Sequence, residues 1–172
     1  MNFKKLLDVE HSKELTNRIV EHVINNPNKM GDLVDLMINA NPRIRQRAAW
    51  PLSMIAQKDP AILKPHLPEL CKELKAKNNH PAINRNILRA LQYIDIPNKY
   101  HSLVIDNSFR LLNSHDEPVA IKVFGMQVLF NLTKYHPDLK NELVASIEQQ
   151  WNNTSVGFKS RGRKILKSLK SN

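Results

Sequence analysis

Basic side chains are the residues of this sequence best suited to chemistry, and that chemistry is the binding of anions. Lysine and arginine number 26 against 16 aspartates and glutamates, which gives a formal net charge of +10. A guanidinium donates paired N–H groups to a carboxylate or a phosphate, and an ammonium attracts either as a point charge. We predict a basic binding face built from residues on equivalent helices: Arg43, Arg45, Arg47, Arg85, Arg89, Lys122, Lys159, Arg161 and Arg163. Such a face attracts an acidic partner, either a protein surface or a nucleic acid.

Patterns for catalysis and for metal binding are weak by comparison. Cys71 shares a helical stripe with Leu70 and Leu74, so it is expected to be a core thiol and not a nucleophile. The seven histidines form no H-x-H or H-x-x-x-H pair, and the four glycines form no phosphate-binding loop. We therefore expect no catalytic residue, no metal and no cofactor.

Trp50 is the candidate for base stacking. It ends the segment RIRQRAAW at 43–50, so its indole follows three arginines. An aromatic ring beside cations can hold a nucleobase, since every base has a π-face. A tryptophan at this spacing also fits a helix that buries it against a neighbour, and that packing role is the alternative.

Helices must position these residues. Prolines follow residues suited to helix starts in the pairs Asn41-Pro42, Asp59-Pro60, His80-Pro81, Glu117-Pro118 and His136-Pro137. Between these pairs apolar residues recur at steps of three and four, and the strict alternation of a strand is absent. The sequence therefore predicts an all-α protein.

The helices also repeat. Apolar residues in one register, Ile44, Ile83, Ile121 and Phe158, lie 39, 38 and 37 residues apart. Apolar or small residues follow each of them at offsets 4, 8 and 11, which is one face of a helix. A first helix precedes each of these second helices, at about 30–39, 62–76, 100–112 and 138–151, and an extra helix covers about 12–25. Pro51 lies inside the first of the second helices and is expected either to kink it or to mark a boundary.

Helix pairs with a period near 40 residues resemble HEAT repeats. The resemblance is clearest over 63–94, where His80-Pro81-Ala82-Ile83 opens the second helix and prolines stand in the first. It implies a right-handed α-solenoid, an α-α superhelix of about four HEAT-like helix pairs plus an N-terminal helix. We expect one domain over 1–172, with a capping region at 1–27 and repeats at about 28–58, 59–96, 97–135 and 136–172. An irregular helical bundle is the alternative, which the shared register and period disfavour.

The excess positive charge lies on one helix of each pair. The second helices carry a formal +12 in total, whereas the first helices carry zero. The resemblance implies that second helices line the concave surface, so we predict a groove with basic walls. Two alternatives stay open. The residue after the aligned position in HEAT repeats is often a structural arginine, which applies to Arg45, and the basic last helix can be a solubilising cap.

We therefore predict a non-enzymatic HEAT-like module that binds an acidic partner. The alternative is a DNA-repair enzyme, because RIRQRAAW is similar to the arginine-rich helix starts of the HEAT-like alkylpurine DNA glycosylases. That family needs an acid beside an exposed indole, such as Asp95, Asp106 or Asp116, but no acid follows either tryptophan by four residues. A third alternative is a structural adaptor that recruits a subunit through an apolar edge.

The sequence also predicts where the protein works. No apolar run approaches the roughly 20 residues that span a bilayer, so no membrane partner is expected. A single cysteine excludes an intrachain disulfide and favours a reducing cytoplasm. Nothing in the sequence sets the oligomeric state.

Overall fold

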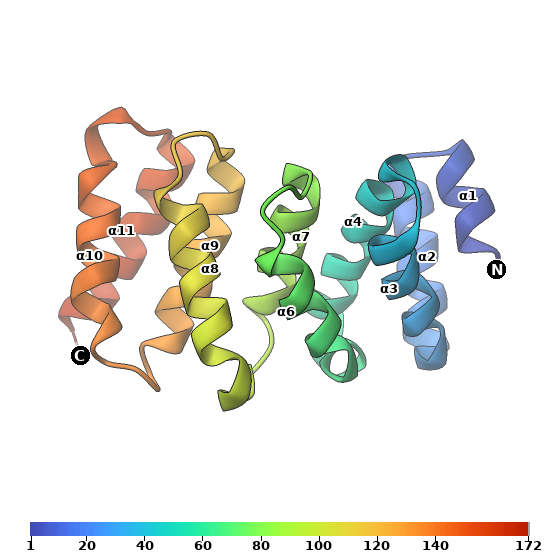
Figure 1. Cartoon of the computed structure of the whole chain (residues 1–172), viewed down its shortest axis with the longest axis horizontal. Coiled ribbons are helices and arrows are strands. Elements are labelled where there is room, and N and C mark those ends of the chain that lie inside the picture. The colour runs from blue at the N-terminus through green and yellow to red at the C-terminus, as the bar shows by residue number, and fades with distance from the viewer. Residues whose placement is uncertain (172) are drawn as a thin grey trace. The chain divides into compact units, whose positions relative to one another are not determined.

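The computed structural model describes residues 1–171, and every regular element in that stretch is a helix (Figure 1). The predicted all-α class is confirmed. The chain divides into two compact units, Met1–Asp95 and a second that begins at Ile96. Each is described by itself below, as the N-terminal unit and the C-terminal unit. The single domain and the repeat boundaries stay predictions.

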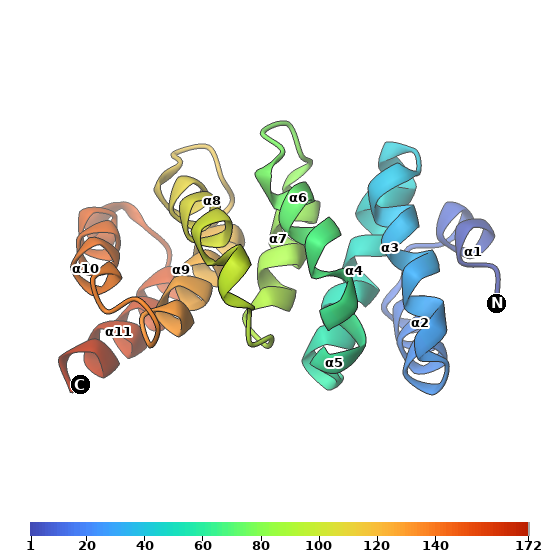
Figure 2. The same cartoon turned by 60° about the horizontal axis from the view of Figure 1, so that its bottom comes forward.

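The N-terminal unit is built from short helices that pack around α4. Its helices are α1 (Phe3–Val9), α2 (Lys13–Asn25), α3 (Met30–Asn39), α4 (Pro42–Lys58), α5 (Pro60–Leu63), α6 (Leu67–Lys75) and α7 (Pro81–Leu91), with 3₁₀ turns at Pro27–Lys29 and Lys64–His66. α4 lies against α7 and also contacts α1, α2 and α3 (Figures 1 and 2). The aligned residues Ile44 and Ile83 are both buried in this core.

The C-terminal unit has four α-helices. They are α8 (His101–Asn113), α9 (Val119–Leu132), α10 (Leu139–Gln149) and α11 (Val156–Lys170), with 3₁₀ turns at Asn98–Tyr100 and Trp151–Asn153. α9 packs between α8 and α11 and also contacts α10 (Figure 2). Ile121 and Phe158 are fully buried, which places the repeat register in the core of this unit as well.

Side-chain caps explain why helices begin at three of the predicted proline pairs. Asn41 Oδ1 accepts the Ile44 N–H at 3.0 Å, and Asp59 Oδ1 accepts the Ala61 N–H at 3.1 Å. His80 Nδ1 accepts the Ala82 N–H at 3.1 Å. In each case proline follows in the first turn, where its missing N–H leaves no intrahelical bond unmade. The other two pairs lie just before α9 and α10, which begin at Val119 and Leu139.

Prolines shape two helices differently. The predicted helix at 62–76 is divided into α5, a 3₁₀ turn that contains Pro65, and α6, with Pro68 in the first turn of α6. α4 instead runs unbroken through Pro51, which is buried inside it. Just beyond, the Ser53 hydroxyl lies 2.9 Å from both the Trp50 carbonyl oxygen and Asn86 Oδ1 of α7. This polar contact ties the proline-containing segment to α7.

Burial weakens along the last helix. The fourth aligned position is buried in α4, at Ile55, in α9, at Leu132, and just beyond the end of α7, at Ile94. Leu166 and Leu169 of α11 are only half-buried. None of the helices formed by residues 1–171 is long and apolar enough to cross a membrane.

Candidate anion-binding hollow

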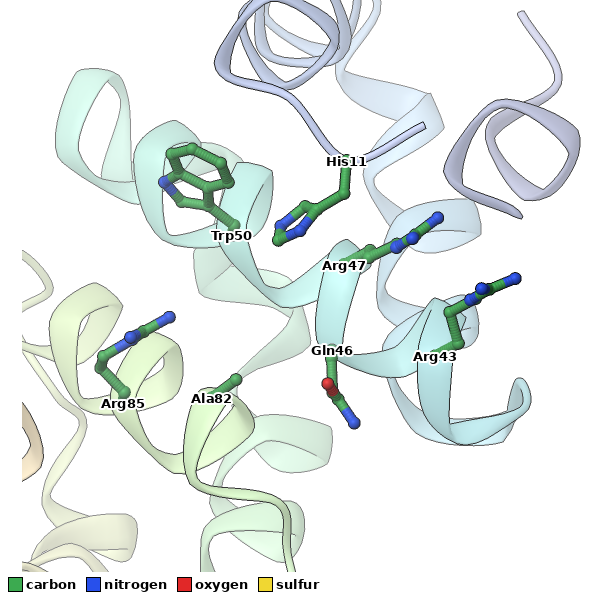
Figure 3. A pocket seen from close by; sticks show the side chains of 7 residues that line it. All are labelled: His11, Arg43, Gln46, Arg47, Trp50, Ala82 and Arg85. Carbon is green, nitrogen blue, oxygen red and sulfur yellow. The ribbon is translucent and has the colours of Figure 1, made fainter. Parts of the chain in front are cut away.

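A hollow of about 550 Å³ lies on the surface of the N-terminal unit (Figure 3). Its walls come from α4, from α7 and from the connection between α1 and α2. The residues that line it are His11, Arg43, Gln46, Arg47, Trp50, Ala82 and Arg85. Three arginines of the predicted basic face and the predicted stacking residue, Trp50, therefore line one hollow.

Helical spacing explains why these side chains share the hollow. Residues 43, 46, 47 and 50 are separated by three, four and seven positions from the first, so they form one stripe on α4. Ala82 and Arg85 are three apart on α7. The buried stripes of the two helices hold them together, which leaves the polar stripes on either side of the hollow.

Two of the guanidiniums have no partner. Arg43 and Arg85 are exposed, and neither forms a hydrogen bond or an ion pair with any residue of the described chain. Arg47 is half-buried, and its Nη1 donates to the carbonyl oxygens of Leu7 at 2.7 Å and Asp8 at 3.0 Å, near the end of α1. No carboxylate is among the lining residues, so their positive charge is not neutralised within the hollow.

The aromatic wall is made by Trp50 and His11. Their ring centroids lie 5.6 Å apart and the rings are inclined at 81°, an edge-to-face contact. Trp50 is half-buried, and no other ring among residues 1–171 contacts it. In Figure 3 Arg85 extends from α7 toward the side of the hollow that holds Trp50, whereas Arg43 and Arg47 extend from α4 in the other direction.

The family model for the HEAT repeat domain matches residues 3–169. The chain is a member of the HEAT repeat family. This confirms the resemblance drawn from the sequence, and with the all-helical structure it makes the fold an α-solenoid. HEAT repeat domains are typically binding or scaffold modules. No curated protein and no solved structure matches the chain.

Arg45 has a structural position in this HEAT repeat protein. Its Nε donates to the Met37 carbonyl oxygen at 2.9 Å, and its Nη2 forms an ion pair with Glu73 of α6. Nη2 also lies 3.4 Å from Asn79 Oδ1. These contacts join α3, α4 and α6, so they favour the structural role over the binding role that the sequence left open.

Lys122 makes an equivalent link in the C-terminal unit. Its Nζ donates to Gln150 Oε1 at 2.8 Å, and Gln150 Nε2 donates to the Leu112 carbonyl oxygen at 3.0 Å. Gln150 follows Lys122 by 28 residues, just as Glu73 follows Arg45. In the same register, Asn84 is buried and accepts from Asn79 Nδ2 at 3.3 Å. Of the residues that directly follow the aligned positions, Arg45 and Lys122 therefore reach the next repeat, whereas Asn84 bonds within its own.

The remaining predicted cations do not line the hollow. Arg89 Nη2 lies 3.4 Å from Gln57 Oε1, and Arg161 Nη1 donates to Gln127 Oε1 at 2.8 Å. The Arg163 guanidinium lies 5.9 Å from the centroid of the Trp151 ring. Lys159 is half-buried on α11 and has no partner within residues 1–171. Their binding role stays a prediction.

No hydroxyl, thiol, amine or carboxylate side chain is among the residues that line the hollow. Asp95, Asp106 and Asp116 are not among the residues that line it. Cys71 is buried in α6, and its burial raises the pKa of the thiol to about 11, which keeps it protonated at neutral pH. Within the described residues no three His, Cys, Asp or Glu side chains are grouped in a way that could hold a metal ion.

Three lining residues, His11, Gln46 and Ala82, were not predicted from the sequence. Ala82 lies three residues before Arg85 on the same face of α7, so the helical period could have found it. Gln46 could have been found, because it lies three residues after Arg43 and four before Trp50 on the same stripe. His11 could not, because it lies between the first two helices and reaches the hollow only through the packing of α1 and α2 on α4.

Proposed function

We propose that this HEAT repeat protein is a non-enzymatic binding module and that its hollow in the N-terminal unit binds an anionic partner. The observation that carries the proposal is the pair of exposed guanidiniums, Arg43 and Arg85, which face a hollow without a carboxylate. An arginine that serves stability would be expected to have a partner, as Arg45 does with Glu73. Arg43 and Arg85 have none, and this leaves their N–H groups for a ligand.

Size and electrostatics support the same proposal. The hollow, at about 550 Å³, falls within the range of about 300–1,000 Å³ that is usual for ligand pockets. Walls of one charge sign raise the local concentration of an oppositely charged ligand and speed its approach. A net charge of +10 acts in the same direction over the whole chain.

The test compares two double variants that lose the same charge. Arg43→Gln with Arg85→Gln removes the free guanidiniums of the hollow. Lys64→Gln with Lys72→Gln removes two exposed cations of the same unit that do not line it. Binding of fluorescent single-stranded DNA, duplex DNA, RNA and polyglutamate is measured at two salt concentrations.

We expect the arginine variant to lose most of its affinity for the anion that the wild type binds, and the lysine variant to lose much less. The affinity of the wild type should fall with added salt, because bound phosphates or carboxylates release counterions. If the two variants lose affinity equally, the hollow is not the site. If the wild type binds none of the four polyanions, the proposed function is wrong.

The DNA-repair alternative gains no support at this hollow, because no carboxylate lines it beside Trp50. The adaptor alternative likewise has no specific observation in its favour.

A further inference from the structure

We infer that the anion in the hollow is a single-stranded nucleic acid, with one base stacked on Trp50 and its phosphates on Arg43 and Arg85. This inference rests on the proposed function, since it assumes that the hollow binds an anion. It goes further in naming a ligand with two parts, a flat aromatic ring and a negatively charged backbone.

One wall of the hollow is aromatic. Trp50 lines the hollow and is half-buried, so part of its indole faces the open space. Its ring contact with His11 is edge-to-face, at 81°, and no ring of the described chain is stacked parallel on it. The exposed part of this indole can stack on a nucleobase. Such stacking contributes substantially to the binding of single strands and requires no particular base.

The two free arginines are placed to contact phosphates. Arg43 comes from α4 and Arg85 from α7, so the two free guanidiniums stand on different walls of the hollow. Figure 3 shows Arg85 reaching toward the side of the hollow that holds Trp50, and Arg43 reaching the other way. A strand that places one base on Trp50 brings phosphates on both sides of that base, and each phosphate can accept a bidentate pair of hydrogen bonds from a guanidinium.

Other polyanions use the hollow less well. An acidic peptide would satisfy the arginines but has no flat ring to cover the indole. A duplex has rings, but they are paired and stacked on each other, so exposing one costs unstacking energy. A single strand offers its bases freely, and for this reason the observations favour it.

The experiment separates stacking from charge. Binding is measured for a fluorescent oligothymidylate and for an abasic strand with the same number of phosphates. We expect wild-type protein to bind the oligothymidylate about ten-fold more tightly than the abasic strand. Trp50→Leu should remove that difference and leave the affinity for the abasic strand unchanged. Arg43→Gln with Arg85→Gln should weaken the binding of both strands.

A second measurement leaves the hollow intact. The chain has two tryptophans, so Trp151→Phe makes Trp50 the only source of indole fluorescence. We expect oligothymidylate to quench this fluorescence at saturation, and the abasic strand and polyglutamate to leave it nearly unchanged. This arm does not depend on whether Trp50→Leu folds.

Each contrary result has a distinct meaning. Equal affinity for the two strands, with no quenching by the oligothymidylate, would overturn the inference but keep the hollow as an anion site. The inference would also be overturned if polyglutamate bound more tightly than the oligothymidylate. Tighter binding of a duplex, with an affinity that Trp50→Leu does not change, would overturn it as well. Failure of wild-type protein to bind any of these polyanions would overturn the proposed function together with the inference.

Discussion

The helix pairs α4–α7 and α9–α11 hold equivalent places in the repeat register, yet their hollows differ. The one on α4 and α7 measures about 550 Å³ and has three arginines and Trp50 in its walls. The one on α9 and α11 measures about 280 Å³, and its cations are Arg161 and Lys164. When Ile44 is aligned with Ile121, and Ile83 with Phe158, each hollow residue of α4 and α7 has a counterpart in the C-terminal unit. The positions of Arg43, Arg47, Trp50 and Arg85 are held there by Ala120, Phe124, Gln127 and Ser160, in that order. None of the four counterparts is charged.

This difference shows that the summed charge of a helix does not locate the larger hollow. α11 is the most basic of the four second helices, with six lysines and arginines between Val156 and Lys170. The position equivalent to Arg85 is nevertheless a serine, and Arg161 donates to Gln127. The hollow is formed by one stripe on α4, another on α7 and His11, and the summed charge of a helix does not distinguish such a stripe from its other faces.

A second comparison concerns the links between repeats. Arg45 and Lys122 occupy the same register position and each reaches a residue 28 positions further on. In the N-terminal unit the partner is the carboxylate of Glu73, which gives an ion pair. In the C-terminal unit it is the neutral amide of Gln150. The same geometric link is therefore charged in one unit and only charge-assisted in the other.

The largest expected effect is on the reactivity of Cys71, which lies on α6 together with Glu73. With its pKa raised to about 11 by burial, the thiol holds about one-hundredth of the thiolate of an ordinary cysteine at pH 8. Alkylation by iodoacetamide should therefore be about a hundred-fold slower than for an exposed thiol, or slower still. The rate should rise through pH 9 to 11 as the thiol ionises.

The Cys71 thiol also reports on the two links. Glu73→Ala loosens α6 and should speed the alkylation of Cys71, whereas Gln150→Ala acts in the other unit and should leave the rate unchanged. Fast alkylation of the wild type at pH 8 would contradict the burial of this thiol. Equal acceleration by both variants would mean that the units do not open separately.

The next effect is on stability. Glu73→Ala leaves the Arg45 guanidinium without its counterion at a site where the two side chains are only 26% and 13% exposed. We expect a loss of about 2 kcal/mol in the free energy of unfolding, between the values for surface and buried ion pairs. Gln150→Ala removes hydrogen bonds between largely neutral groups and should cost about 1 kcal/mol.

Urea unfolding followed by circular dichroism measures both losses. Glu69→Ala is the matched control, because Glu69 is an exposed acid on α6 with no partner in the described chain. Its effect should stay within about 0.5 kcal/mol. A loss for Glu73→Ala no larger than for the control would show that the ion pair does not stabilise the unit.

A transplant tests the comparison of the hollows directly. Ala120→Arg with Ser160→Arg places arginines in the C-terminal unit at the positions equivalent to Arg43 and Arg85. If a long single strand contacts both added arginines, we expect it to bind about ten-fold more tightly than it binds the wild type. The slope of log affinity against log salt should steepen by about 0.7 for each added phosphate contact.

The matched control puts the same substitutions on first helices. Ala145→Arg with Ser102→Arg adds equal charge to exposed positions of α10 and α8. It should raise the affinity less, because its arginines lie outside the equivalent stripe. Equal gains from the two double variants would mean that net charge, and not position, governs binding.

The helices and their buried faces could be predicted from the sequence, whereas contacts between distant helices could not. The period of apolar residues predicted the helices, their register and the buried face, because burial in a repeat depends on spacing within each helix. The stripe from Arg43 to Trp50 was predictable for the same reason. The partners of Arg45 and Lys122, and the arrival of His11 at the hollow, were not, because they depend on how helices far apart in the sequence pack.

The smallest expected effect is the difference in stability between alanine substitutions at two glycines of α11. Gly162 holds the register position that Ile87 holds in the N-terminal unit, and a Cβ there would lie 3.0 Å from Trp151 Cζ3 and 3.1 Å from Ile147 Cγ2. At Gly157 the nearest atom, Ser155 Oγ, would be at an ordinary 3.7 Å.

Alanine favours a helix over glycine by about 0.8–1 kcal/mol, so Gly157→Ala should stabilise the protein by about 0.5–1 kcal/mol. Gly162→Ala should gain nothing or lose about 1 kcal/mol, because the crowding cancels the helical preference. Thermal unfolding of the two variants side by side measures the difference, and equal stabilisation by both would show that Trp151 does not limit how closely α11 packs on α10.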